Sequence, residues 1–320
     1  MTKIIQNFNQ KRFIVLILCN LVLIKTYAQS NSDNYVLVKG GIQIPMGSFA
    51  SPTNVNVVKT YSQIASSSGG KVNGGLLLPA TSGYGLSIQA NHSIINKIGL
   101  AVNAGYANYG SDASAASKSS EEIVSLLSGP LLTSLIGSQL GGSGAGSFLN
   151  NSGTSIKTTF QNNNWQLYSV LLGPSISLNS GNISLGVRAQ AGFIYFTSPE
   201  VTANLDLTSS FFSTSILKIK QASVSKAIFA TQLGLDIRYH IMNNLGIMLY
   251  NDFLFTPSTS FDTEITYEVP IAALLGNTFQ TPTSLKSSNN ISIQSWNTGV
   301  GVFYQFEGFN TKNKSISPIE

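Results

Sequence analysis

The chain has 320 residues, of which only 10% are charged, and it contains 29 glycines and a single cysteine. Ordinary soluble domains carry about 25% charged residues, so a soluble globular enzyme is a poor match to this composition. The formal net charge is +5, but most of this excess lies in the first 28 residues, and the rest of the chain has no basic patch that would indicate nucleic-acid binding.

The first 28 residues have the features of a secretory signal peptide. Lys3, Lys11 and Arg12 form a positive start, Phe13 to Ile24 is apolar, and Ala28 is the small residue expected at a cleavage site. We therefore predict a signal peptide over 1–28 and a mature domain over 29–320. An uncleaved anchor is the alternative, but the apolar stretch is short for a membrane span.

Cleavage after Ala28 changes both the charge and the thiol chemistry of the protein. Four of the 18 basic residues leave with the signal, so 14 basic residues face 13 acidic ones and the net charge falls to +1. Cys19 is also removed, which leaves no disulfide and no thiolate metal site.

Eight segments of the mature chain have strand character, and most are long enough to cross a membrane at a tilt. They are Tyr35–Ile44, Gly83–His92, Ile98–Tyr109, Trp165–Leu178, Ile183–Phe196, Ala227–His240, Leu245–Phe255 and Trp296–Glu307. Within them apolar side chains alternate with Gly, Ser, Asn and Gln, for example Ile98, Leu100 and Val102 against Gly99, Ala101 and Asn103. Because successive strand side chains point to opposite faces, each segment has one apolar and one small polar face. A soluble sandwich also alternates, but its outer face normally carries many charges.

The connections between these segments alternate strictly between short and long. Short turns occur near Asn96, at Asn179–Asn182 and at Met242–Asn244, whereas long connections cover 45–82, 110–164, 197–226 and 256–295. Outer-membrane barrels have short periplasmic turns and long extracellular loops. The sequence therefore predicts an all-β, up-and-down antiparallel transmembrane β-barrel of about eight strands in the outer membrane. Ten strands are the alternative, if 201–207 with 215–223, or 263–269, join the barrel rather than form loop hairpins.

Aromatic residues lie near the predicted strand ends, where the two lipid–water boundaries of a barrel would be. The end next to the long loops carries Tyr84, Tyr106, Tyr109, Trp165, Tyr168, Tyr195, Phe229, Phe253, Phe255 and Trp296. The opposite end carries Tyr35, Tyr239, Tyr304 and Phe306. We expect these residues to form two belts.

Three short stretches resemble a known family. They are Gly40-Gly41-Ile42-Gln43-Ile44-Pro45-Met46-Gly47-Ser48-Phe49, Gly83-Tyr84-Gly85-Leu86 and Gly301-Val302-Phe303-Tyr304-Gln305-Phe306. They look like Bacteroidetes-type outer-membrane β-barrel domain proteins, in the OmpA/OmpX-like class of eight-stranded barrels. The resemblance implies a barrel fold and a last strand read by the barrel-assembly machinery. It implies no particular activity.

Six charged residues are predicted to face the lumen, namely Lys39, Arg188, Asp236, Arg238, Asp252 and Glu307. Charges in a narrow interior should pair with one another. The interior of an eight-stranded barrel is just wide enough for side chains to fill it, so a structural ion-pair network is favoured over an ion path.

No catalytic residue, cofactor or metal site can be assigned from the sequence. Nucleophilic catalysis needs a base near the nucleophile, and both histidines, His92 and His240, are placed at the predicted periplasmic end. We therefore expect a monomeric, non-enzymatic barrel that contacts outer-membrane lipid and presents its long loops to an unidentified extracellular partner. A small porin or transport-accessory barrel is the alternative function. One long loop also predicts a helix at about 119–140, capped by Ser120.

Overall fold

The computed structural model describes residues 34–51, 72–73, 78–95, 97–112, 155–208, 213–242, 244–268 and 284–306. The signal peptide predicted over 1–28, the helix predicted at about 119–140 and Glu307 lie outside these residues. No helix in the described ranges is long and apolar enough to cross a membrane. The described strands and helix are β1 (Asn34–Met46), α2 (Gly47–Ala50), β2 (Val72–Asn73), β3 (Ala80–Ile95), β4 (Ile98–Ser111), β5 (Ser155–Asn162), β6 (Trp165–Ser180), β7 (Ile183–Thr197), β8 (Val201–Thr208), β9 (Ser213–Gln221), β10 (Ser225–His240), β11 (Leu245–Phe255), β12 (Thr259–Glu268), β13 (Ser284–Ile291) and β14 (Gln294–Phe306).

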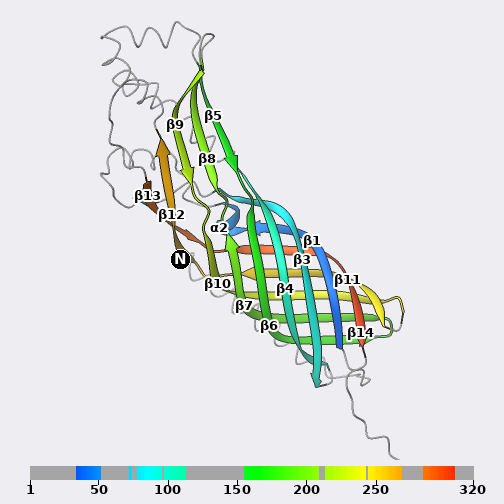
Figure 1. The fold of residues 1–320 in the computed structure, drawn as a ribbon. Helices are drawn as coiled ribbons and strands as arrows, with labels where there is room; N and C mark the ends of the chain where they lie inside the picture. The colour runs from blue at the N-terminus through cyan, green and yellow to red at the C-terminus, as the bar shows by residue number, and fades with distance from the viewer. Residues whose placement is uncertain are drawn as a thin grey trace, which may run out of the picture.

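Eight of these strands form a closed antiparallel barrel in the order β1-β14-β11-β10-β7-β6-β4-β3 (Figure 1). β1 pairs with β14 on one side and with β3 on the other, which closes the sheet on itself. The eight strands are those predicted from the sequence, most of them longer by a few residues. Every neighbouring pair is antiparallel, so the predicted up-and-down barrel is confirmed.

The short connections lie together at one end of the barrel. β6 and β7 are joined by a two-residue turn at Gly181 and Asn182, and Gly181 has a φ of 58°. A positive φ is disfavoured for residues with a Cβ, so glycine suits this position. Asn34 pairs with Phe306, which places the start of β1 and the end of β14 at this same end.

The remaining six strands form a second, open sheet in the order β2-β13-β12-β9-β8-β5. In Figure 1 this sheet extends beyond the barrel on the side opposite the short turns. The segments that could have made a ten-stranded barrel, 201–207, 215–223 and 263–269, contribute strands to this sheet instead. The barrel therefore keeps eight strands, and the hairpin alternative is the one that the structure supports.

The second sheet continues five barrel strands in their original neighbour order. Breaks of two or three residues separate β5 from β6, β7 from β8, β9 from β10, β11 from β12 and β13 from β14. Hydrogen bonds span these breaks, including Ser198 N to Val224 O at 2.9 Å and Thr256 N to Ile293 O at 2.9 Å. The extension, as we call this sheet, is thus a prolongation of one side of the barrel wall, whereas β1, β3 and β4 are not prolonged in the described residues.

The two faces of the barrel wall are opposite in character. β10 alternates regularly, with Leu233, Leu235 and Ile237 exposed on the outside and Gln232, Asp236 and Arg238 buried inside. β11 repeats this order, with Ile247 and Leu249 outside. The alternation predicted from the sequence therefore corresponds to an apolar exterior and a polar interior.

Three of the predicted belt aromatics were assigned to the wrong face. Tyr35, Tyr109 and Trp165 are 2%, 0% and 0% exposed and point into the barrel. The physical reason is the period of two. In β4 the even-numbered residues Leu100 and Val102 face outward, so Tyr109 must face inward, and Trp165 is its partner on β6.

Candidate functional site

The lumen of the barrel contains a network of buried ion pairs. Arg188 on β7 pairs through its two terminal nitrogens with Asp236 on β10 and Asp252 on β11. Lys39 on β1 completes the chain of charges, with Nζ 2.6 Å from Asp252 Oδ2. All four side chains are at most 2% exposed. Four strands from distant parts of the sequence therefore converge on one cluster.

Arg238 extends this network towards the short-turn end. Its Nε lies 3.1 Å from Asp236 Oδ1, and its Nη2 donates to Ser177 Oγ at 2.8 Å. The guanidinium carbon stands 4.4 Å from the centre of the Tyr35 ring, a cation–π distance. The structure thus brings together five of the six charged residues predicted to line the lumen, while Glu307 lies outside the described residues.

Glycines on the neighbouring strands make room for the charged side chains. Gly234 is directly opposite both Asp252 and Arg188, and Gly186 is directly opposite Asp236. A Cβ at Gly234 would stand only 2.6 Å from Arg188 Nε, and one at Gly186 only 2.7 Å from Asp236 Cγ. The ion pairs can therefore lie against the barrel wall only because Gly234 and Gly186 have no side chains.

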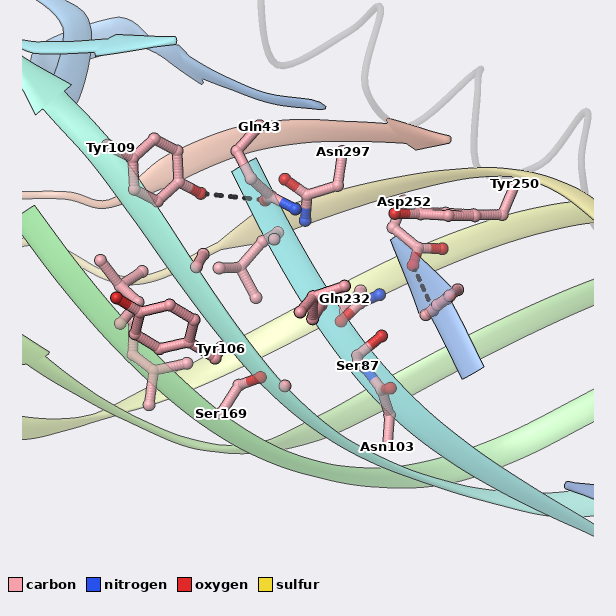
Figure 2. A pocket seen from close by; sticks show the side chains of 18 residues that line it. Gln43, Ser87, Asn103, Tyr106, Tyr109, Ser169, Gln232, Tyr250, Asp252 and Asn297 are labelled. Carbon is pink, nitrogen blue, oxygen red and sulfur yellow. Dashed lines mark hydrogen bonds and ion pairs between the residues drawn. The ribbon is translucent and has the colours of Figure 1, made fainter. Parts of the chain in front are cut away.

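A cavity of about 50 Å³ lies between the ion pairs and the loop end of the lumen. Figure 2 shows Asp252 at one end of this cavity and Tyr109 with Gln43 at the other. Tyr109 donates a hydrogen bond to Gln43 Oε1 at 3.3 Å. Between these ends five uncharged polar side chains line the cavity, Ser87, Asn103, Ser169, Gln232 and Asn297, together with apolar ones that include Leu167, Ile194 and Leu254. We call this cavity the chamber.

The loop end of the lumen is closed by an aromatic cluster. Phe49 of α2 packs edge-on between Tyr109 and Trp165, with ring centres 5.0 and 5.3 Å away. Trp165 also donates a hydrogen bond from Nε1 to the backbone oxygen of Leu78 at 3.2 Å. Phe49 and Leu78, near the start and the end of the connection between β1 and β3, therefore both contact Trp165. Phe196 and Phe261 extend the cluster to the base of the extension.

A second apolar cluster fills the lumen on the other side of the ion pairs. It consists of Tyr35, Leu37, Met248, Tyr250 and Phe303, of which Tyr250 also lies beside Lys39 and reaches the chamber. The ring of His240 packs edge-on against Phe303, and its Nε2 lies 2.7 Å from Gln305 Oε1. The lumen thus has four layers in sequence, namely the aromatic cluster, the chamber, the ion pairs and this smaller cluster.

The two histidines of the chain lie near the short-turn end of the barrel. His240 is held by Gln305 at the short-turn end, and His92 is exposed near that end on β3. Neither histidine belongs to the ion-pair network or lines the chamber. Among the described residues no group of three or more His, Cys, Asp or Glu side chains is placed to hold a metal ion.

Sequence reasoning missed the residues that close the lumen. Tyr109 and Trp165 could have been found from the parity of their strands, which places both on the inner face. Phe49 carried no such signal, because it lies on a four-residue helix within a connection that was expected only to be a loop.

No protein-family model matches the chain, and no curated protein matches its sequence. Solved structures of several outer-membrane proteins are similar to it at low identity. Neisserial surface protein A is 10% identical with a TM-score of 0.37, covering 88% of this chain and 100% of its own. A major outer membrane protein from Thermus thermophilus is 12% identical with a TM-score of 0.37, covering 86% and 99%. The outer membrane protease OmpT from Escherichia coli is 10% identical with a TM-score of 0.32, covering 88% and 99%.

Likenesses this weak concern the fold alone and do not distinguish one function from another. The three proteins include a protease and a surface protein, and they lend no support to a Bacteroidetes-type origin.

Proposed function

We propose that this chain is an integral outer-membrane protein whose closed barrel anchors an extended surface sheet outside the membrane. The observation that supports this proposal best is that the barrel wall has apolar side chains on its outer face and charged side chains on its inner face, the reverse of a soluble protein. Leu86, Val170 and Leu233 are 59%, 62% and 59% exposed on the outside, while Lys39, Arg188 and Asp252 are buried inside. Large apolar patches on a soluble protein mark binding or aggregation sites, but around a closed barrel they match the apolar band that faces lipid.

Exposed aromatic side chains support the same orientation. Those near the extension are Tyr84, Tyr168, Phe193, Tyr195, Phe229, Phe253, Phe255 and Trp296, and those near the short turns are Tyr239, Tyr304 and Phe306. Aromatic side chains favour the lipid–water boundaries, where an apolar ring and a polar edge can both be accommodated. The two groups would mark the two surfaces of the membrane, with the extension on the outer side.

The layered lumen favours an anchoring and surface-interaction role over a pore. A solute would have to pass the aromatic cluster around Phe49, the ion pairs of Arg188 and the cluster around Phe303. An eight-stranded barrel has little room beyond its own side chains. We therefore place the small-porin alternative second, and we assign the surface contacts to the extension and the long connections. We propose no catalytic role.

Export and assembly complete the proposal. The predicted signal peptide over 1–28 would direct the chain across the inner membrane, and β14 would be the strand recognised by the barrel-assembly machinery. β14 pairs with both β11 and β1, so it is the strand whose docking closes the barrel. We propose a monomer, because the closed barrel leaves no open strand edge within the membrane-facing wall.

The proposal is tested by electrophoresis of the outer-membrane fraction with and without boiling. A closed membrane barrel keeps its fold in the detergent, so the unboiled protein should migrate faster than the boiled protein. A protein recovered from the periplasm, with one unshifted band, would contradict the membrane location. An outer-membrane band that does not shift would contradict the stable closed barrel.

A further inference from the structure

We propose that the chamber is a binding site for a small cluster of water molecules, held between the aromatic cluster and the ion pairs. The site goes beyond the proposed anchoring function, because it concerns how a sealed lumen keeps its polar groups solvated. The chamber measures about 50 Å³, which leaves room for on the order of three waters.

Two unpartnered acceptors point to this ligand. Asn103 is 3% exposed, and its Oδ1 accepts no hydrogen bond from the described residues. Asn297 Oδ1 is likewise buried and without a donor in the described part of the chain. Both side chains line the chamber, from β4 and β14 (Figure 2). A buried amide oxygen without a donor is unfavourable, so a donor small enough to fit is expected here.

The other lining groups can complete the hydrogen bonding of such waters. A buried water typically makes two to four hydrogen bonds, so a polar cavity is needed to hold one. Ser87 and Ser169 supply hydroxyls, and Gln232 supplies an amide, from three further strands. A wholly apolar cavity of the same size would stay dry, whereas the polar side chains in this mixed lining offer hydrogen-bond partners to water.

The charges around the chamber favour neutral water over an ion. Lys39 faces the chamber already paired with Asp252, and Asp252 also binds Arg188. A cation entering the chamber would meet the Lys39 ammonium, and an anion would meet the Asp252 carboxylate. A neutral molecule that both donates and accepts avoids either repulsion, and water is the smallest such molecule.

The first experiment is a crystal structure of the detergent-folded chain at a resolution that shows ordered water. We expect electron density for water within hydrogen-bond distance of both Asn103 Oδ1 and Asn297 Oδ1. An empty chamber with both asparagines in the same orientation would overturn the proposal. Density for a larger solute or an ion would also overturn it.

The second experiment compares two leucine variants on the same strand. Asn103→Leu removes a proposed water anchor, so the unfolding equilibrium constant in urea should rise about tenfold. Asn108→Leu is the control on the outer face of the same strand, because Asn108 Oδ1 is also unpartnered among the described residues but does not line the chamber. Asn103→Leu with stability equal to or above that of the natural chain would mean that the chamber is dry, since an unsatisfied amide is improved by an apolar isostere. Equal losses in the two variants would also contradict a water site.

Discussion

Individual charged residues inside this barrel depend on one another more than on solvent. Asp252 is the shared partner of Lys39 and Arg188, so one carboxylate is divided between two buried cations, and Asp236 supplies the second negative charge beside Arg188. Removing one partner from a buried pair leaves an uncompensated charge in a low-dielectric site, which is far more unfavourable than losing a surface pair. Asp252 is therefore the residue at which the network is most sensitive.

Asp252→Asn keeps the size of the side chain but leaves Lys39 and Arg188 competing for Asp236. We expect the free energy of unfolding to fall by about 3–5 kcal/mol, the range found when a buried ion pair is broken. The measurement is urea unfolding of the barrel refolded into lipid vesicles. Asp262→Asn on β12, whose side chain is exposed, is the control and should change stability by at most about 1 kcal/mol, because interactions of exposed carboxylates contribute little. Similar effects of the two substitutions would show that the lumen network contributes little.

Gly234→Ala tests whether the absence of a side chain opposite Asp252 and Arg188 is required. The added Cβ would stand 2.6 Å from Arg188 Nε, so the guanidinium or the strand must move. We expect a loss of about 1–3 kcal/mol in the same unfolding assay, as for other overpacked interiors. Gly40→Ala is the control, because its Cβ would meet the flexible end of Leu86 at 3.0 Å. If both variants unfold alike, the interior is looser than the register implies.

At the scale of elements, the barrel wall and the extension are joined by short breaks that retain hydrogen bonds across neighbouring strands. β7 and β10 pair from Thr197 opposite Ser225 down to Ile183 opposite Tyr239, and β8 and β9 resume the pairing beyond the break. Because the barrel pairing is complete without the outer segment, the wall should form independently of the extension.

Replacing residues 199–223 with Asn-Gly, which removes β8 and β9 from the extension, tests this independence. Ser198 N is hydrogen-bonded to Val224 O at 2.9 Å, so the two ends are already placed as a tight hairpin requires. We expect the shortened protein to keep its faster unboiled migration. The control deletes 194–228 with the same turn, which removes the buried residues Ile194, Phe196 and Ile228 and should abolish the shift. Failure of the shorter deletion to fold would show that β8 and β9 stabilise the barrel.

At the scale of the whole molecule, the lumen is closed by layers of different chemistry. The aromatic cluster around Phe49 excludes water by packing, and the ion pairs below the chamber close the lumen by filling it with paired side chains. Each layer blocks passage independently, so opening one should not open the barrel.

The purified barrel in planar lipid bilayers should therefore show no conductance steps above leak, and Phe49→Ala should behave in the same way. The variant removes the ring packed between Tyr109 and Trp165 but leaves Arg188 bound to both carboxylates. The double variant Phe49→Ala, Arg188→Ala is compared with the single variant, since it weakens both the aromatic cluster and the ion pairs. Discrete channels in the natural chain would instead favour the small-porin alternative.

The sequence by itself determined the strands, their number and the character of their faces. The alternation of Leu233, Leu235 and Ile237 with Gln232 and Asp236 is a local pattern with a period of two, and it survives in the folded wall. The alternation of short and long connections can also be read directly along the sequence. It predicted that the additional structure lies at the end of the barrel opposite the short turns. Tyr109 and Trp165 were assigned to a belt from their position near a strand end, without regard to which face the alternation gives them. Both point inward, so that assignment was wrong.

The tertiary structure alone decided which groups meet. Lys39 and Asp252 are 213 residues apart, and their contact depends on the register of several intervening strands. The same holds for the chamber, the insertion of Phe49 and the pairing of the outer strands into one sheet. Register depends on closure of the whole barrel, since a shift of one residue in any strand would turn its inner side chains outward. No single segment carries that information, so it emerges only when all eight strands are assembled.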